Sequence, residues 1–249
     1  MSSDELTKLF NILKRINLSK DCEITFEAND DSLNLDKIKL LRDFGVNRVS
    51  IGVETINYKL QSVLEGKTDK EIVIKCINTL KNNGITNINV DLIYAIKGET
   101  LNDLRIDLDF LISLDVPHIS TYSLIIENNT KLKINHIKNI DKSLDRKTDD
   151  RISKILEDNN YIHYEISNFS KEGYRSKHNL KYCNKLEYYG FGVGASSYVN
   201  NIRYTNTRSI TKYINSTNIS TSGILCLFFY PTIRKRSSIK SRRVRTSIR

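Results

Sequence analysis

The chain has 249 residues, 39% of them hydrophobic and 27% charged, which is enough to build a full core in one large or two small domains. Its formal net charge is +10, but the eight basic residues between Arg234 and Arg249 supply most of it, so the rest of the chain is nearly neutral and no nucleic-acid partner is expected. No apolar run is long enough to span a membrane, and polar residues rather than a signal sequence follow Met1, so we expect a protein of the cytoplasm.

Helices and strands alternate along the first half of the chain. Apolar residues at helical spacing and glycine stops predict helices at residues 3–17, 35–44, 57–64, 69–83 and 101–113. Runs of β-branched and other apolar residues predict strands at 22–28, at 48–53, from Asn87 onward and at 118–125. This alternation predicts right-handed crossovers and a parallel sheet, with a ligand site at the carboxyl ends of the strands. A barrel or partial barrel fits the pattern as well as an open sheet does.

The stretch from Asn87 to Leu104 combines a strand, a glycine turn and a helix start. Its strand is dense in apolar residues, which is typical of a parallel strand covered on both faces, yet it carries one acid, Asp91. Thr100 is expected to cap the following helix, together with Asp103 three residues later.

Three acids lie at or just past predicted strand ends: Glu27, Glu54 and Asp91. In a parallel sheet these ends converge on one mouth, where carboxylates accept hydrogen bonds from ribose hydroxyls or from an amine. Each acid taken alone is better explained as a helix cap or a solvated loop residue. Three in register favour a ligand site.

The composition changes after Glu127. Residues 128–145 are polar and rich in lysine and asparagine, which indicates a linker or lid, and a helix at 149–159 and a strand at 161–166 follow. The sequence therefore predicts a first domain at residues 1–125 and a second, mixed α/β region at 126–215, followed by a tail at 216–249.

The motifs in the first 205 residues have the order of a known family. EITFEAND, VSIGVETIN, INVDLIYAIKGET, YEISNFSKEG, KHNLKYC and YYGFGVGASSY together resemble the radical S-adenosylmethionine proteins related to oxygen-independent coproporphyrinogen oxidase. YEISNF and the HNxxY pattern are similar in particular to the HemW-type branch, the heme chaperones. The resemblance implies an α/β fold, a partial (β/α) barrel with a smaller mixed α/β C-terminal region, and heme or porphyrin handling as the ancestral task.

By that resemblance, Glu27, Glu54 and Asp91 fall on positions that contact S-adenosylmethionine, and Asp91 would take the ribose hydroxyls. Glu54 stands where many relatives have glutamine, and Gly66 and Lys67 occupy the region of a family arginine. YAIKGET stands where relatives resemble YGLPGQT, so a glycine and a proline are missing from the loop. Among the four histidines, His178 in KHNLKY is the candidate heme ligand, and the alternative for each is a surface or hydrogen-bonded core histidine.

The family's three cluster-binding cysteines, in a CxxxCxxC loop, and its GGGTPS-like segment have no counterpart in this sequence. Cys22, Cys76, Cys183 and Cys226 are widely spaced, whereas an iron–sulfur cluster needs thiolates held close together. We therefore expect an N-terminally truncated member, without the 4Fe-4S cluster ligands and unable to perform radical chemistry alone. An upstream fragment of the same gene is then an expected partner, and the strand at 22–28 should expose an unpaired edge.

The tail from Thr221 to Arg249 has no family likeness. An apolar run, GILCLFFYP, is followed by a stretch in which arginine outnumbers lysine, unlike the rest of the chain. A frameshifted reading frame explains both the composition and the lost likeness, and we favour it over a basic arm for nucleic acid or anionic lipid. Two functions remain: a truncated radical S-adenosylmethionine protein of heme handling, or a non-catalytic heme- or partner-binding protein.

Overall fold

The computed structural model describes residues 1–126, 142–215 and 228–229. Its elements in the first part of the chain are α1 (Ser3–Leu13), β1 (Thr25–Asn29), the 3-10 helix η1 (Asp30–Ser32), α2 (Leu35–Phe44), β2 (Arg48–Glu54), α3 (Tyr58–Leu64), α4 (Lys70–Asn82), β3 (Asn87–Tyr94), α5 (Leu101–Ser113) and β4 (His118–Ser123). Those that follow are α7 (Lys142–Glu157), β5 (Ile162–Glu165), β6 (Asn168–Ser170), α8 (Lys177–Cys183), β7 (Ser196–Val199), β8 (Ile202–Thr205), α9 (Ile210–Asn215) and β9 (Phe228–Phe229).

The main sheet is built around four parallel strands, as the sequence predicts. Its order is β5-β6-β4-β3-β2-β1-β9, in which β1 to β4 are parallel neighbours and β6 joins β4 antiparallel. The expectation of an unpaired edge at residues 22–28 is wrong for part of that strand, because Thr25 and Phe26 pair with β9. A local sequence pattern cannot predict pairing with a two-residue strand from a distant part of the chain.

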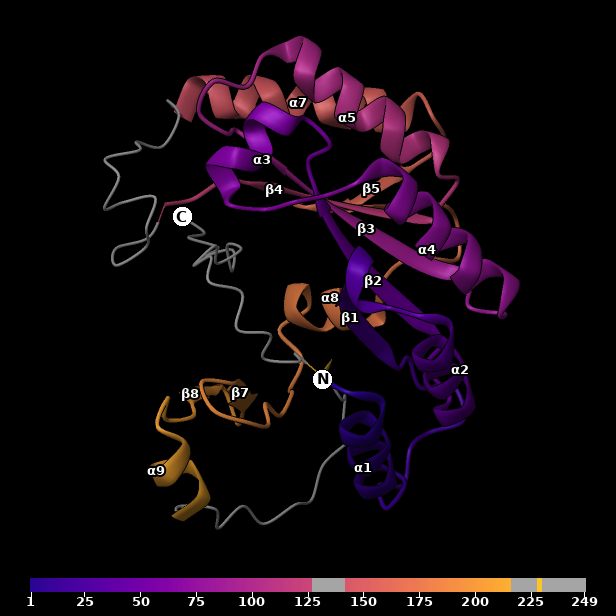
Figure 1. Cartoon of the computed structure of the whole chain (residues 1–249). Coiled ribbons are helices and arrows are strands. Elements are labelled where there is room, and N and C mark those ends of the chain that lie inside the picture. Colours follow the sequence, from indigo (N-terminus) through magenta and orange to yellow (C-terminus); the bar gives the residue numbers. More distant parts are fainter. Residues whose placement is uncertain (127–141, 216–227, 230–249) are drawn as a thin grey trace.

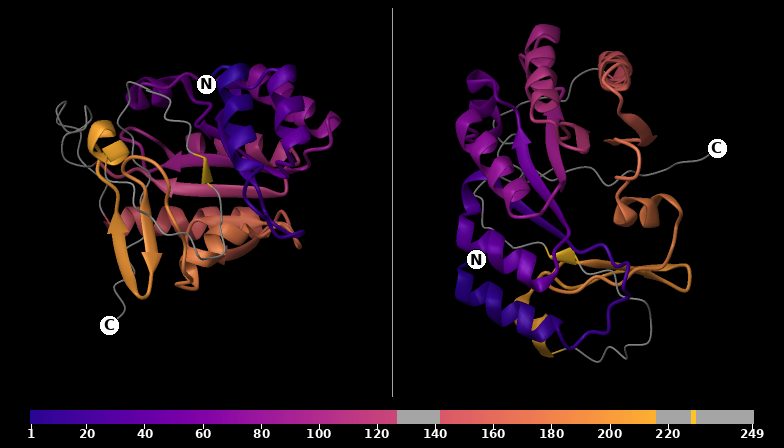
Figure 2. Two further views of the ribbon diagram at one scale, coloured as in Figure 1. Left: turned by 90° about the horizontal axis from the view of Figure 1, so that it is seen from below. Right: turned by 90° about the vertical axis from the view of Figure 1, so that its right-hand side faces the viewer.

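One face of the sheet is apolar and covered by helices. Val49, Ile51, Ile88, Val90 and Leu92 alternate along β2 and β3 and are fully buried on this side. Helices α1, α2, α4, α5 and α7 contribute apolar side chains to the same core, whereas α3 packs in a second, smaller cluster with Ile93. The β7–β8 hairpin and α9 lie apart from the helices over the sheet (Figures 1 and 2). The apolar residues thus form the core, and the other face of the sheet is left for polar side chains.

Local sequence signals set most helix boundaries. Gly45 ends α2 in the left-handed conformation at φ 102°, which glycine adopts without strain. The side chain of Thr100 accepts from the backbone N–H of Asp103, whose carboxylate accepts in return from the backbone of Thr100. The predicted capping of α5 is confirmed.

The chain after residue 141 departs from the prediction at one point. The helix expected at 149–159 runs from Lys142 to Glu157. Its first turns are not predicted because the polar sequence there lacks the apolar periodicity that marks a helix. The rest of the predicted linker lies outside the described residues, as does most of the tail.

Strands β5 and β6 join the main sheet, and the domain division at 125/126 stays a prediction. Within the described ranges, no helix is long and apolar enough to cross a membrane.

Candidate functional site

The face of the sheet opposite the apolar one carries buried polar side chains in register. Partners across parallel strands point to the same side, so the register assigns them to successive rows. The rows, taken from β1 across the sheet, are Thr25, Arg48 and Asn87; then Glu27, Ser50, Asn89, His118 and Ser170; then Asn29, Gly52, Asp91, Ser120 and Asn168. A buried sheet with one polar face is a scaffold for a polar ligand rather than for a second apolar layer.

Asp91 lies in the third row and is held by neighbouring donors. Its Oδ1 accepts from Asn89 Nδ2 at 2.8 Å, and its Oδ2 accepts from the Ser50 hydroxyl at 3.3 Å. Burial raises the pKa of Asp91, while hydrogen bonds from Asn89 and Ser120 and then the charge of Arg48 favour the ionised form. Each carboxylate oxygen has a second lone-pair direction, so the group can accept two further hydrogen bonds.

His118 is fully buried at the start of β4 and bonded through both ring nitrogens. Its Nδ1 lies 2.5 Å from Asn89 Oδ1, and its Nε2 lies 2.7 Å from the hydroxyl of Tyr164. Burial, and then the charge of Arg48, hold the pKa of His118 well below its ordinary value. The ring is therefore neutral, and it is the hydrogen-bonded core histidine that the sequence offered as one of two alternatives.

Glu54 ends β2 in a strained conformation. Its φ of 64° is in the left-handed region, which is unfavourable for a residue with a Cβ, and the pairing with β3 shifts register between Gly52 and Glu54. The segment after it is fixed by the buried Asp107 of α5, which accepts from the hydroxyl of Thr55 at 2.7 Å and from the backbone N–H of Ile56 at 2.8 Å. Strain at a strand end that is held by a buried acid is typical of a functional position.

The three predicted acids are only partly brought together. Glu27 and Asp91 share the polar face, one row apart, because Glu27 is in register with Ser50 and not with Gly52. Glu54 lies at the end of its strand and close to Gly66. A Cβ atom placed on Gly66 would lie 3.0 Å from the Oε2 atom of Glu54. Two of the acids lie within their strands rather than past them, so the assignment of all three to one ligand stays a prediction.

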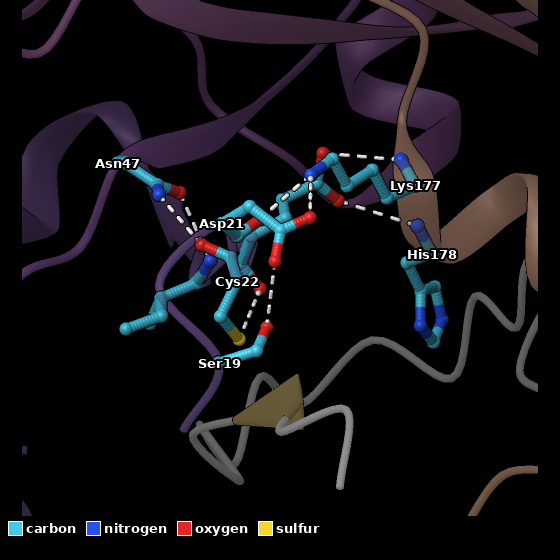
Figure 3. A network of polar contacts seen from close by, with 8 residues as sticks. Ser19, Asp21, Cys22, Asn47, Lys177 and His178 are labelled. Carbon is cyan, nitrogen blue, oxygen red and sulfur yellow. Dashed lines mark hydrogen bonds and ion pairs between the residues drawn. The ribbon is translucent and has the colours of Figure 1, made fainter. Parts of the chain in front are cut away.

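His178 lies on α8, which docks against the segment before β1 (Figure 3). The carboxylate of Glu23 accepts from the backbone N–H groups of Lys177 and His178 and from the hydroxyl of Ser176. Lys177 Nζ reaches the backbone oxygen of Asp21 at 2.6 Å. The half-buried His178 ring points away from these contacts and packs edge-on against Tyr182, with the ring centroids 4.4 Å apart.

The cysteines do not form a cluster site. Cys22 is half-buried, Cys76 is buried on α4, Cys183 is exposed at the end of α8, and Cys226 lies outside the described residues. In the part of the chain that the structure describes, no group of three or more histidine, cysteine or acidic side chains could hold a metal ion. Among the described residues, the cysteines are therefore not grouped as the ligands of an iron–sulfur cluster would be.

Comparison with known proteins defines the class first. Residues 1–111 match the Radical SAM superfamily. Within it, the chain is similar to proteins named heme chaperone HemW: it is 38% identical to the one from Lactococcus lactis subsp. lactis over 222 residues and 33% identical to the one from Bacillus subtilis over 221. These matches cover 87% and 86% of this chain but 58% of each relative, so the chain spans less than two thirds of their length.

A solved structure confirms the fold. Coproporphyrinogen III oxidase (HemN) from Escherichia coli, described as a radical SAM enzyme, superimposes with a TM-score of 0.74 over 86% of this chain and 53% of that one. The sequence identity is 19%, so this likeness concerns the fold. The α/β sheet with a small C-terminal hairpin therefore agrees with the resemblance found in the sequence.

Sequence reasoning missed three polar residues that shape the surroundings of the acids. Asn89, His118 and Asp107 did not stand out, although Asn89 and Asp91 alternate along one strand. That alternation of polar residues in an otherwise apolar strand was the available signal, because it marks one face of a buried strand as polar. Asp107 gave none, since a single acid on an amphipathic helix is ordinarily solvated.

Proposed function

We propose that this chain is a heme-handling protein of the HemW type, which binds the adenosyl group of S-adenosylmethionine on the polar face of its sheet. The observation that carries the proposal is Asp91, a carboxylate set in a buried sheet and oriented by Asn89 and Ser50. The similarity to HemW proteins over most of this chain supports the same task.

Asp91 has the chemistry for a ribose. A pair of neighbouring hydroxyls needs two acceptors a short distance apart, and the free lone pairs of one carboxylate supply them. Asn89 and Ser50 donate to different oxygens of the carboxylate, so neither oxygen receives both of these bonds. Glu27 and Glu54 are proposed to contact other parts of the same ligand. Because the cluster does not fit the described residues, the steps proposed for this chain are binding steps.

Calorimetric titration with S-adenosylmethionine tests the adenosyl site. Asp91→Asn keeps the shape of the side chain but replaces one acceptor with a donor and removes the charge. We expect the affinity to fall roughly 10- to 100-fold, as for the loss of hydrogen bonds to a charged group. Glu172→Gln, at an exposed position, is the matched control and should bind like the wild type. Equal affinities for the wild type and the Asp91 variant would remove the proposal's main support.

The heme part of the proposal concerns His178. Its ring projects from a short helix that is fixed at its N-terminus by Glu23, so the imidazole has a defined position. Titration with hemin, followed by the Soret band, should give one heme per chain in the wild type and a lost or shifted band in His178→Ala. His163→Ala is the control, since His163 is exposed and stacks on Phe169 in β6. Identical spectra of the two variants would exclude His178 as the ligand.

A non-catalytic heme- or partner-binding protein is the second candidate. Among the described residues, the cysteines lie far apart. This separation favours a binding protein over a radical enzyme. The two titrations separate the candidates. Binding of both ligands supports the HemW-type proposal, and binding of hemin without S-adenosylmethionine supports the second.

A further inference from the structure

A chain of hydrogen bonds crosses the polar face from α8 to Asp91. The backbone N–H of Ser176 donates to the hydroxyl of Tyr164 at 3.2 Å, and that hydroxyl contacts His118 Nε2 at 2.7 Å. His118 Nδ1 contacts Asn89 Oδ1, and Asn89 Nδ2 donates to Asp91 Oδ1. The chain joins the element that carries the candidate heme ligand to the candidate ribose ligand.

The donor and acceptor of every hydrogen bond in this chain follow from the Asp91 carboxylate at its end, which can only accept. An aspartate oxygen accepts from Asn89, so the amide must present Nδ2 to Asp91 and Oδ1 to the histidine. His118 must then carry its proton on Nδ1, and the bare Nε2 accepts from Tyr164. Burial raises the pKa of Tyr164 to about 12, so its hydroxyl keeps the proton that it donates. All four bonds therefore run the same way, from α8 toward the carboxylate.

Other contacts also orient Asn89, because its Nδ2 donates to the hydroxyl of Ser50 at 2.7 Å as well as to Asp91. The hydroxyl of Ser120 lies 2.9 Å from Asn89 Oδ1 and 2.8 Å from Asn168 Oδ1, and it has one proton for the two. His118 has a fixed ring and a fixed proton, because it is wholly buried and bonded at both nitrogens. A rotated Asn89 amide would turn an oxygen toward Asp91 and repel it. The neutral imidazole thus acts together with Ser50 and Ser120 to keep the amide in its working orientation.

We propose that His118 is a positioning residue, which holds the Asp91 carboxylate through Asn89 and makes it respond to the docking of α8 through Tyr164. The ligand that Asp91 takes rests on the proposed function, but the coupling between α8 and Asp91 does not.

The first test is made without ligand. The pKa of Asp91 is followed by side-chain carbon-13 resonances in the wild type and two variants. His118→Asn retains an N–H near the position of Nδ1 and should titrate like the wild type, whereas His118→Leu removes the donor, frees Asn89 and should raise the pKa of Asp91. A merely structural role predicts that both variants behave alike, and that result, or no shift in either, overturns the proposal.

The second test addresses the link to α8. Tyr164→Phe removes one hydroxyl, and its control is Tyr161→Phe, because the buried hydroxyl of Tyr161 donates at 2.6 Å to the backbone of Val116, outside this chain of bonds. In Tyr164→Phe, the nitrogen-15 shifts of His118 should show a mixture of tautomers, and the affinity for S-adenosylmethionine should fall roughly 2- to 10-fold. In Tyr161→Phe both should be unchanged.

The two failures are distinguishable. If the wild type does not bind S-adenosylmethionine, the proposed function fails, while the carbon-13 and nitrogen-15 measurements still decide the role of His118. If binding occurs but Tyr164→Phe and Tyr161→Phe have the same tautomer and the same affinity, the coupling is refuted and the adenosyl site stands.

Discussion

Glu99, in the loop between β3 and α5, should make this protein less stable as the pH rises. Its Oε2 accepts from the backbone N–H of Ile96 at 3.2 Å, while its Oε1 is buried without a hydrogen-bond partner among the described residues. Burial raises the pKa of Glu99 from 4.5 to about 7, and the nearby carboxylates of Asp107 and Asp103 act in the same direction. The folded protein therefore holds this proton more tightly than the unfolded chain.

The sign and size follow from proton linkage. Between the unfolded pKa of 4.5 and the folded pKa of about 7, the native state binds more protons, so the free energy of unfolding falls as the pH rises. The stabilising contribution is complete below the lower value and lost above the higher one. A shift of this size corresponds to at most about 3 kcal/mol. Glu99→Gln cannot ionise and still accepts from Ile96, so it should abolish the loss.

Urea unfolding followed by circular dichroism at two pH values measures the effect. Glu99→Gln should be more stable than the wild type by about 1–3 kcal/mol near pH 8, and most of that gain should be absent near pH 5. Glu172→Gln, at an exposed position, should show little difference at either pH. An equal gain for Glu99→Gln at both pH values would refute the reasoning, because it would then come from packing and not from ionisation.

Three other predictions concern the same scaffold. Ala95 has a φ of 63° just after β3, so Ala95→Gly should raise the free energy of unfolding by about 0.5–1 kcal/mol in urea titrations; a loss would show that this conformation is unstrained. Asp107→Ala leaves the buried hydroxyl of Thr55 without its acceptor and should cost about 2–3 kcal/mol by the same assay, whereas a neutral result would mean that water replaces the carboxylate. Iodoacetamide should alkylate the exposed Cys183 in the native protein but Cys76 only after unfolding, because burial raises the pKa of the Cys76 thiol to about 12; mass spectrometry that finds Cys76 modified first would contradict this.

Local sequence was sufficient for most of the secondary structure. The helix at Leu35–Phe44 and the helix at Leu101–Ser113 agree with prediction at both ends, because a left-handed glycine ends one and a threonine–aspartate pair begins the other. The start of α7 was missed since its first turns are polar. The missing family glycine in YAIKGET has a structural counterpart in the left-handed conformation of Ala95.

The candidate site was predictable in kind and not in arrangement. The sequence singled out Glu27, Glu54 and Asp91, and the fold places Glu27 and Asp91 on one face while Glu54 turns at the end of its strand. His118 was seen as one histidine among four with no assigned role. Its contacts come from residues that are 29 and 46 positions away in the chain, and no local pattern reports such distances.

The sequence by itself determined the alternation of strands and helices, the parallel sheet and the likeness to radical S-adenosylmethionine proteins, because these depend on periodicity, capping residues and motifs that are local. Only the tertiary structure decided which polar side chains meet. Strand register set Glu27 one row from Asp91, and the docking of α8 on Glu23 completed the chain of hydrogen bonds through Tyr164 and His118. Register and docking are non-local: they arise when distant segments bury their surfaces together, and each buried polar group must then find its partner in whichever element lies beside it.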